Sequence, residues 1–96
     1  MRITTHPGEK LREEFLAPLG MSANALARAL NLDAPRINDV VRERRGITAD
    51  TALRLGRYFG TTPEFWTNLQ TSHELSKALA KAKEAIQAIQ PREHVA

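Results

Sequence analysis

The chain has 96 residues, no cysteine and a formal net charge of +3, with a sequence pI of about 9.8. This length fits one domain with a modest core, and the lack of cysteine excludes disulfide and thiolate chemistry and fits a reducing cytosol. No apolar run approaches the roughly 20 residues of a membrane span, and no signal peptide is evident. We therefore expect a single cytoplasmic domain over residues 1–96 that has no membrane contact.

The first predicted helix begins near Pro7, since proline fits the first turn of a helix, where its missing N–H costs little. Leu11 and Phe15 are four residues apart, so both are expected to face the core. Pro18 and Gly20 are expected to end this helix.

Two short helices joined by a tight turn are predicted over residues 22–45. Ser22 suits the start of the first, about residues 22–30, because its hydroxyl can accept from an unpaired backbone N–H. Asn31 tolerates the positive φ that the turn requires. The apolar stripe of this helix is Leu26, Ala27 and Leu30.

The second of the two helices spans about residues 33–43, with Asp33 as N-cap and Pro35 in its first turn. A short helix with an apolar back and a front of guanidinium and amide groups suits the major groove of DNA, where Arg reads guanine and Asn reads adenine. The predicted buried face is Ile37, Val40 and Val41, and the other face carries Arg36, Asn38, Asp39 and Arg42.

These helices, with the run GITADTALRLGRYFGTTPEFWTNLQ at residues 46–70, resemble the lambda-repressor-like (XRE) helix-turn-helix family. The long second run is similar to HigA-type, or VapI-like, antitoxins, and the resemblance covers roughly residues 5–80. It implies an all-α domain of five helices with an extended C-terminal helix. It also implies two partners, double-stranded operator DNA and a HigB-type mRNA-cleaving toxin, and repression of the protein's own operon.

The family also implies which positions read bases: the first two residues of the recognition helix and one about a turn and a half later. In this chain they are Ala34, Pro35 and Asp39, which offer apolar contact to a thymine methyl and an acceptor for cytosine N4. We therefore expect Arg36 and Asn38 to supply much of the polar readout, although ordinary helix-surface polarity also explains Asn38.

Residues 34–45 hold four arginines against two acidic residues, a local balance of +2. Arginines can simply solvate an exposed helix end, but the helix-turn-helix pattern before them favours phosphate contact, for which their forked donors are suited. Glu43 stands where the family has a small residue, so the turn after the helix should be longer or helical. The predicted DNA-binding residues are Ser22, Ala34, Pro35, Arg36, Asn38, Asp39, Arg42, Arg44 and Arg45.

A fourth helix should begin after Thr48 as N-cap and end at Gly60. Its Arg54 is expected on the surface. Tyr58 and Phe59 are expected in the core rather than as a stacking platform for bases, since no repeated basic-aromatic pattern surrounds them.

The C-terminal helix is predicted over about residues 63–90, with Thr62 as its cap and Trp66 in the core. Its apolar residues are spaced 4, 3, 4 and 3, an a/d seam too short for a coiled coil on its own. Such a stripe requires a partner surface on its own domain, on another protein or on a second copy in a homodimer. The predicted dimer interface is Leu75, Leu79, Ala82, Ile86 and Ile89.

Nothing in the sequence indicates an enzyme. His6, His73 and His94 lack metal-ligand spacing, and Ser72 beside His73 lacks the geometry of a catalytic pair. We expect no metal and no cofactor. Two alternatives stay open: a stand-alone XRE-type regulator without a toxin, and a protein-interaction module that has lost DNA binding, which the non-basic reading positions favour.

Overall fold

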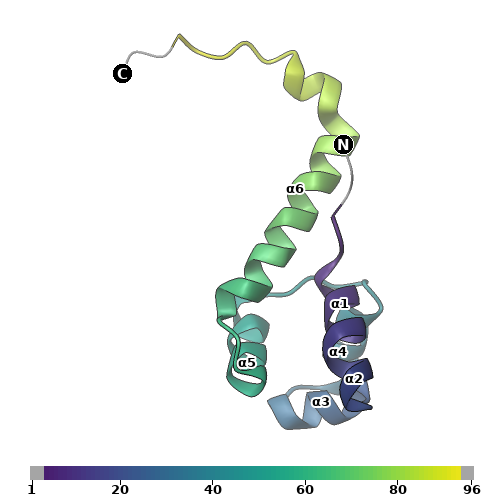
Figure 1. Ribbon diagram of the computed structural model, residues 1–96. Helices are drawn as coiled ribbons and strands as arrows, with labels where there is room; N and C mark the ends of the chain where they lie inside the picture. The colour runs from purple at the N-terminus through teal and green to yellow at the C-terminus, as the bar shows by residue number, and fades with distance from the viewer. Residues whose placement is uncertain (1–3, 94–96) are drawn as a thin grey trace.

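The structure is a computed structural model that describes residues 4–93, and it confirms the predicted all-α class over that range (Figure 1). Three consecutive elements at the N-terminus form one continuous helix, so the described chain has the five helices expected from the sequence. None of them has the length and apolar character needed to cross a membrane. The elements are α1 (Pro7–Lys10), η1 (Leu11–Leu16), α2 (Ala17–Leu19), α3 (Ala23–Leu30), α4 (Ala34–Val41), α5 (Ala49–Phe59) and α6 (Pro63–Gln87).

The first helix widens in its middle, where η1 is wound as a π-helix. The N–H of Ala17 donates to the carbonyl of Arg12, five residues back rather than four. Pro18 lies within the helix, which runs to Leu19 and is closed by Gly20 in the left-handed region at φ 59°. The prediction of a glycine stop is confirmed, whereas the π-helix has no signal in the sequence.

The helix starts follow the predicted capping residues. Ser22, Thr48 and Thr62 each accept, through the side-chain oxygen, from the backbone N–H three residues further on. Asn31 adopts φ 57° in the turn between α3 and α4, as predicted. Asp33 occupies the N-cap position of α4, but its side chain makes no capping hydrogen bond, so the predicted cap is wrong in that respect.

The core lies where η1, α3, α4, α5 and α6 meet. Trp66 is fully buried, and its indole N–H donates to the Thr61 hydroxyl at 2.8 Å. The ring of Phe15 lies with its centroid 4.9 Å from the rings of both Phe59 and Trp66. The predicted apolar faces are confirmed: the buried hydrophobic residues are Leu11, Leu16, Leu26, Ala27, Leu30, Ile37, Val40, Val41, Ile47, Ala52, Leu55 and Trp66.

Tyr58 departs from the prediction that both aromatic residues at the end of α5 are core. It is 46 % exposed, whereas Phe59 is half-buried against the core. Neighbouring residues of a helix point about 100° apart, so one of two adjacent rings must leave the buried face.

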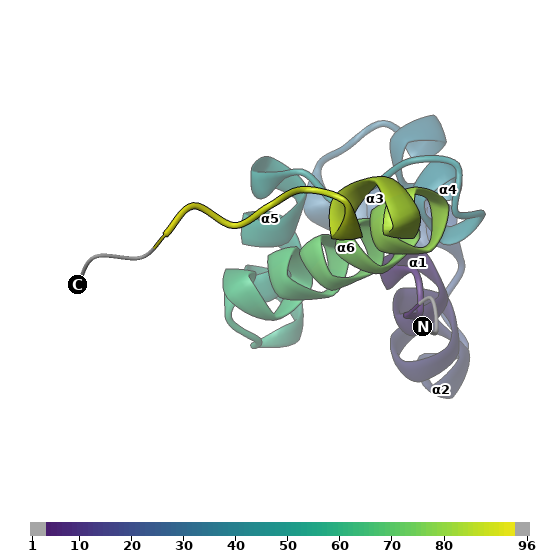
Figure 2. The ribbon, with the colours of Figure 1, turned by 90° about the horizontal axis from the view of Figure 1, so that it is seen from above.

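The helix α6 packs its first turns on α5 and then extends beyond the body of the domain (Figure 1). The residues after α6 lead away to the side, as the view from above shows (Figure 2). The molecule consequently measures 52 × 27 × 22 Å. The backbone of Ala82 is non-helical (φ −119°, ψ 22°), which kinks the helix. The helix ends at Gln87 rather than near residue 90, so Ile89 lies beyond the helical stripe to which the sequence assigned it.

Candidate nucleic-acid interface

The recognition helix α4 presents a narrow outward face. Ile37, with Val40 and Val41, is buried behind it, and Pro35 and Arg42 are exposed in front. Since successive helical residues point about 100° apart, Arg36 and Asn38, on either side of Ile37, point to opposite flanks of the helix. The prediction that these two side chains share the front of α4 is therefore wrong.

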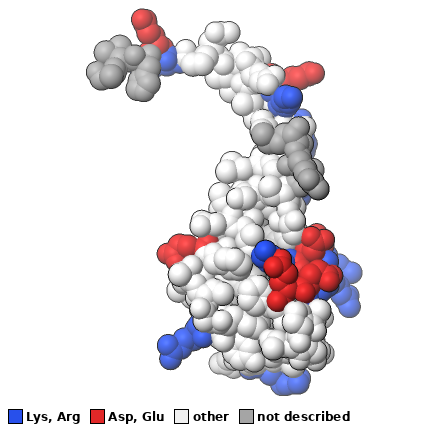
Figure 3. All heavy atoms as spheres, in the orientation of Figure 1, with Lys and Arg blue, Asp and Glu red and all other residues white. Residues whose placement is uncertain are grey.

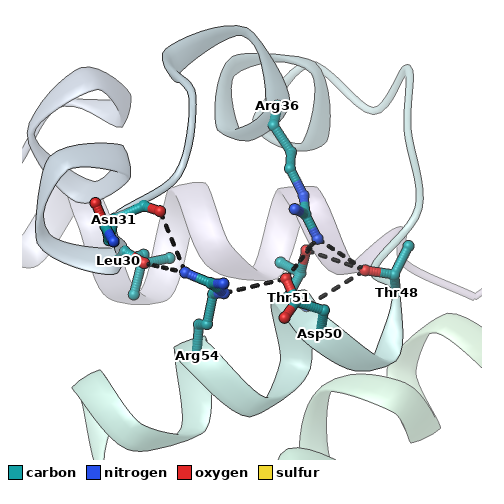
Figure 4. Close-up of polar contacts among 7 residues, drawn as sticks. All are labelled: Leu30, Asn31, Arg36, Thr48, Asp50, Thr51 and Arg54. Atoms are coloured by element: carbon teal, nitrogen blue, oxygen red, sulfur yellow. Dashed lines mark hydrogen bonds and ion pairs between the residues drawn. The ribbon is translucent and has the colours of Figure 1, made fainter.

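The guanidinium of Arg36 is directed at the start of α5 (Figure 4). Its NH2 group donates to the Thr48 hydroxyl at 3.2 Å, the Asp50 carboxylate at 2.9 Å and the Thr51 hydroxyl at 2.8 Å. Only 27 % of the Arg36 side chain is exposed. The sequence could not show this, because the position of α5 beside α4 decides where the side chain finds acceptors.

Asn38 lies on the other flank of α4, against α3. Its amide nitrogen donates to Asn24 Oδ1 at 2.7 Å and to the backbone carbonyl of Ala34 at 2.9 Å. The side chain is half-buried. Both residues expected to give most of the polar readout thus have donors engaged within the protein.

The three arginines after α4 are exposed, as predicted. Glu43 between them adopts φ 62°, the left-handed conformation usually taken by glycine at a helix end. The N–H of Glu43 donates to the Val40 carbonyl at 2.9 Å, and the N–H of Arg44 donates to the Asp39 carbonyl at 2.8 Å. The helix therefore stops sharply, and the expected longer or helical turn is not found.

The end of α4 is fixed from the first helix. Arg12 donates to the backbone carbonyl of Val41 and forms an ion pair with Glu43 at 3.4 Å. Its hydrogen bond with Glu13, then that with Glu43, raises the pKa of the Arg12 guanidinium. These contacts hold the turn that carries the exposed arginines.

Asp50 joins two guanidinium groups. Its Oδ2 lies 2.9 Å from Arg36 Nη2 and 3.0 Å from Arg54 Nε. The bond from Arg54, and then that from Arg36, lowers the pKa of the Asp50 carboxyl. Arg54 also donates to the carbonyls of Leu30 at 2.8 Å and Asn31 at 3.2 Å, so the expectation that it lies on the surface is only half right. The spacing of Asp50 and Arg54, four residues apart on a helix, is a signal of their pairing that the sequence carries.

The turn formed by residues 42–45 is the arginine turn. A cleft of about 580 Å³ lies between this turn and α6. It contains the rings of His6 and His73, which meet edge to face at 4.9 Å. His94 lies outside the described residues. Within residues 4–93, no three His, Asp or Glu side chains are grouped so as to hold a metal ion.

Charged side chains are unevenly distributed on the face shown in Figure 3. Acidic groups gather at the height of α1, and the shaft of α6 above the body is largely uncharged in this view. Among the residues of the first helix, Glu9, Glu13 and Glu14 are exposed.

Comparison with known proteins gives consistent matches. The model of the helix-turn-helix family HTH_3 matches residues 11–66. Virulence-associated protein I of Dichelobacter nodosus is 57 % identical over 86 residues, which are 90 % of this chain and 79 % of the relative. The structure of Pseudomonas aeruginosa antitoxin HigA with the higBA promoter is 53 % identical with a TM-score of 0.89, over 94 % of this chain and 98 % of that one. Antitoxin GraA in complex with its operator is 49 % identical with a TM-score of 0.90, over 98 % and 95 % of the two chains.

Proposed function

The chain belongs to the XRE-type helix-turn-helix family and, within it, to the HigA-type antitoxins, and on that premise we propose that it represses its own operon by binding operator DNA. This is a family of DNA-binding regulators, not of enzymes. The observation that carries the proposal is the way α4 packs. Its back is buried in the core, and its outward face and the arginine turn after it are exposed. Relatives of the same fold and about half identical in sequence are solved with promoter or operator DNA.

In the proposed complex α4 lies in the major groove. Ala34 and Pro35 give apolar contact to thymine methyl groups, and Asp39 accepts from a cytosine amino group. Arg42, with the turn arginines Arg44 and Arg45, binds phosphates, which fix the register but carry no sequence information. Ser22, the N-cap of α3, is also proposed to contact the DNA.

Asn38 contributes to base reading in this proposal only as far as its contacts to α3 allow. Its amide nitrogen already donates twice, so the side-chain oxygen is the group with capacity to accept, for instance from an adenine or cytosine amino group. Arg36, whose guanidinium is bound at the start of α5, is not assigned to base reading.

The protein is proposed to bind as a homodimer, since two-fold symmetry places two recognition helices about 34 Å apart, one turn of DNA. The proposed interface is the stripe on α6, where Leu75 and Ile86 are 66 % and 44 % exposed and Leu79 and Ala82 are half-buried. Ile89, beyond the helix end, would contribute only as part of a loose extension.

A HigB-type toxin is the second proposed partner, and its neutralisation, in the cytoplasm, would use a surface that DNA leaves uncovered. Membership in the antitoxin family supports this role. Co-expression with the adjacent open reading frame tests it: co-purification of a stable complex is expected, and its absence would favour a stand-alone regulator.

Fluorescence anisotropy tests the DNA-binding proposal. A labelled duplex from upstream of the gene is compared with a scrambled duplex of equal composition, at several salt concentrations. We expect tighter binding to the natural duplex and a linear fall of log affinity with log salt, with a slope of about −0.9 for each phosphate neutralised. Equal, weak binding to both duplexes would instead indicate a protein-interaction module that has lost DNA recognition. The internal contacts of Arg36 and Asn38 are the observation that favours this alternative.

A further inference from the structure

The Asp50 carboxylate links α5 to α4 directly and to α3 through Arg54. Asp50, in the first turn of α5, contacts Arg36 from α4 and Arg54 from its own helix (Figure 4). Arg54 in turn donates to the carbonyls of Leu30 and Asn31, at the end of α3. Carbonyls at a helix end lack partners within their helix, so this bond satisfies groups that would otherwise need water.

The environment of Arg36 suits a structural anchor better than a reader of bases. Its Nη2 has three acceptors at the N-cap and first turn of α5, and one of them, the hydroxyl of Thr51, belongs to a residue that is 1 % exposed. To reach a base edge, Arg36 would have to leave all three acceptors and separate from the Asp50 carboxylate. Charge-assisted hydrogen bonds of this kind are about twice as strong as neutral ones.

We propose that Asp50 is a positioning residue for operator recognition: by binding Arg36 and Arg54 together, it sets the orientation of α4 relative to α3 and α5. Arg36 accordingly holds the recognition helix and does not read bases. This inference rests on the proposed DNA-binding function and specifies which residues of that site act through others.

Asp50 could position α4 for operator binding, or it could merely hold Arg36 away from DNA. Removing the carboxylate charge distinguishes these two roles, because they predict opposite changes in operator affinity. In Asp50→Asn, two guanidinium groups face each other without an anion, so α4 loses its anchor and operator affinity should fall. The salt slope should stay unchanged, because no phosphate contact is lost. If Asp50 merely held Arg36 away from DNA, the same variant would bind more tightly, with a slope steeper by about one phosphate.

Four variants and the wild type are compared by anisotropy with the upstream duplex: Asp50→Asn, Arg36→Met, the double variant and Glu64→Gln. Glu64 is an exposed acid in the first turn of α6, so Glu64→Gln makes the same charge change at an equivalent helix position. We expect about a tenfold loss for each of Asp50→Asn and Arg36→Met, no further loss in the double variant, and wild-type binding for Glu64→Gln. Wild-type affinity in Asp50→Asn, a flatter salt slope in Arg36→Met or additive losses would overturn the proposal.

A measurement without DNA separates this proposal from the proposed function. In NMR spectra of the free protein, the α4 amides and the Arg36 side-chain N–H signals should shift in Asp50→Asn and not in Glu64→Gln. Unchanged signals in Asp50→Asn would overturn the anchor whatever the DNA result. If the NMR shifts support the anchor but the wild-type protein does not prefer its upstream duplex, the proposed DNA-binding function is contradicted and the anchor is not. Circular dichroism of each variant shows whether it is folded under the assay conditions, and Arg36→Lys serves as a milder variant should Arg36→Met fail to fold.

Discussion

Gly8 lies directly against the backbone carbonyl of Val40. A Cβ at residue 8 would be 1.9 Å from the Val40 oxygen, so α1 approaches α4 through the one residue type that leaves room for this contact. The seat of the recognition helix therefore depends on backbone contact with the first helix as well as on apolar packing.

The substitution Gly8→Ala should displace α4 from the first helix. We expect the free energy of unfolding to fall by about 1–3 kcal/mol, as for other overpacked sites, with weaker operator binding. Urea denaturation followed by circular dichroism gives the first quantity and anisotropy the second. In an uncrowded helix position Gly→Ala usually raises stability, so an increase here would contradict the contact.

Substitution of the arginines in the arginine turn should reduce the salt dependence of DNA binding without changing its sequence specificity. Arg44→Ala and Arg45→Ala should each weaken binding to natural and scrambled duplexes equally and reduce the salt slope by about 0.9. Lys83→Ala, which removes an exposed positive charge far along α6, is the control and should keep the wild-type slope. A change in sequence preference in either arginine variant would mean that this arginine reads bases.

The stripe on α6 predicts the oligomeric state. Leu79→Glu and Ile86→Glu should convert a dimer into monomers in sedimentation equilibrium, because each places a charge in the proposed apolar interface. Ala80→Glu adds the same charge at an exposed position away from the stripe and should leave the dimer intact. An unchanged mass for both interface variants would exclude this face of α6.

The cap of α1 predicts that stability depends on pH. His6 is buried and accepts from the Gly8 N–H through Nδ1 at 2.8 Å. Burial, and then the charge of His73, lowers the pKa of His6. Since the folded state binds a proton less readily than the unfolded chain, the stabilisation is complete above about pH 6.5 and is lost as the pH falls from there through the lowered folded-state value.

Thermal unfolding between pH 5 and pH 8 measures this dependence. His6→Asn keeps a capping acceptor that does not titrate in this range, so its unfolding temperature should change less with pH than that of the wild type. Equal pH dependence in both proteins would show that His6 does not cause it.

Local signals predicted most of the fold. Ser22, Thr48 and Thr62 cap helices through bonds to residues three positions away, and Asn31 and Gly60 adopt the left-handed conformation that short turns require. These features depend on neighbours in the chain, so the sequence shows them directly. The buried faces of α3 and α4 likewise follow from helical spacing.

The main departures at the site depend on contacts between distant segments. Arg36 turns to α5 because Asp50 and Thr51 lie there. The exposure of Tyr58 is a local exception, because adjacent helical residues cannot both face the core. The left-handed Glu43 is held by Arg12 from the first helix. The sequence thus predicts the helix and the turn that make up the candidate site, whereas the contacts of single side chains are not visible in it. Whether each predicted residue contacts DNA stays a prediction.

The enclosure of Trp66 has a spectroscopic consequence. The chain has a single tryptophan, and its indole is shut away from solvent on α6 between Phe15, Phe59 and Phe65. Its emission should therefore be blue-shifted in the native protein and move to longer wavelength only when the core opens. Intrinsic fluorescence will then report unfolding and remain nearly silent when a duplex is added, so that a titration with nucleic acid needs an extrinsic label.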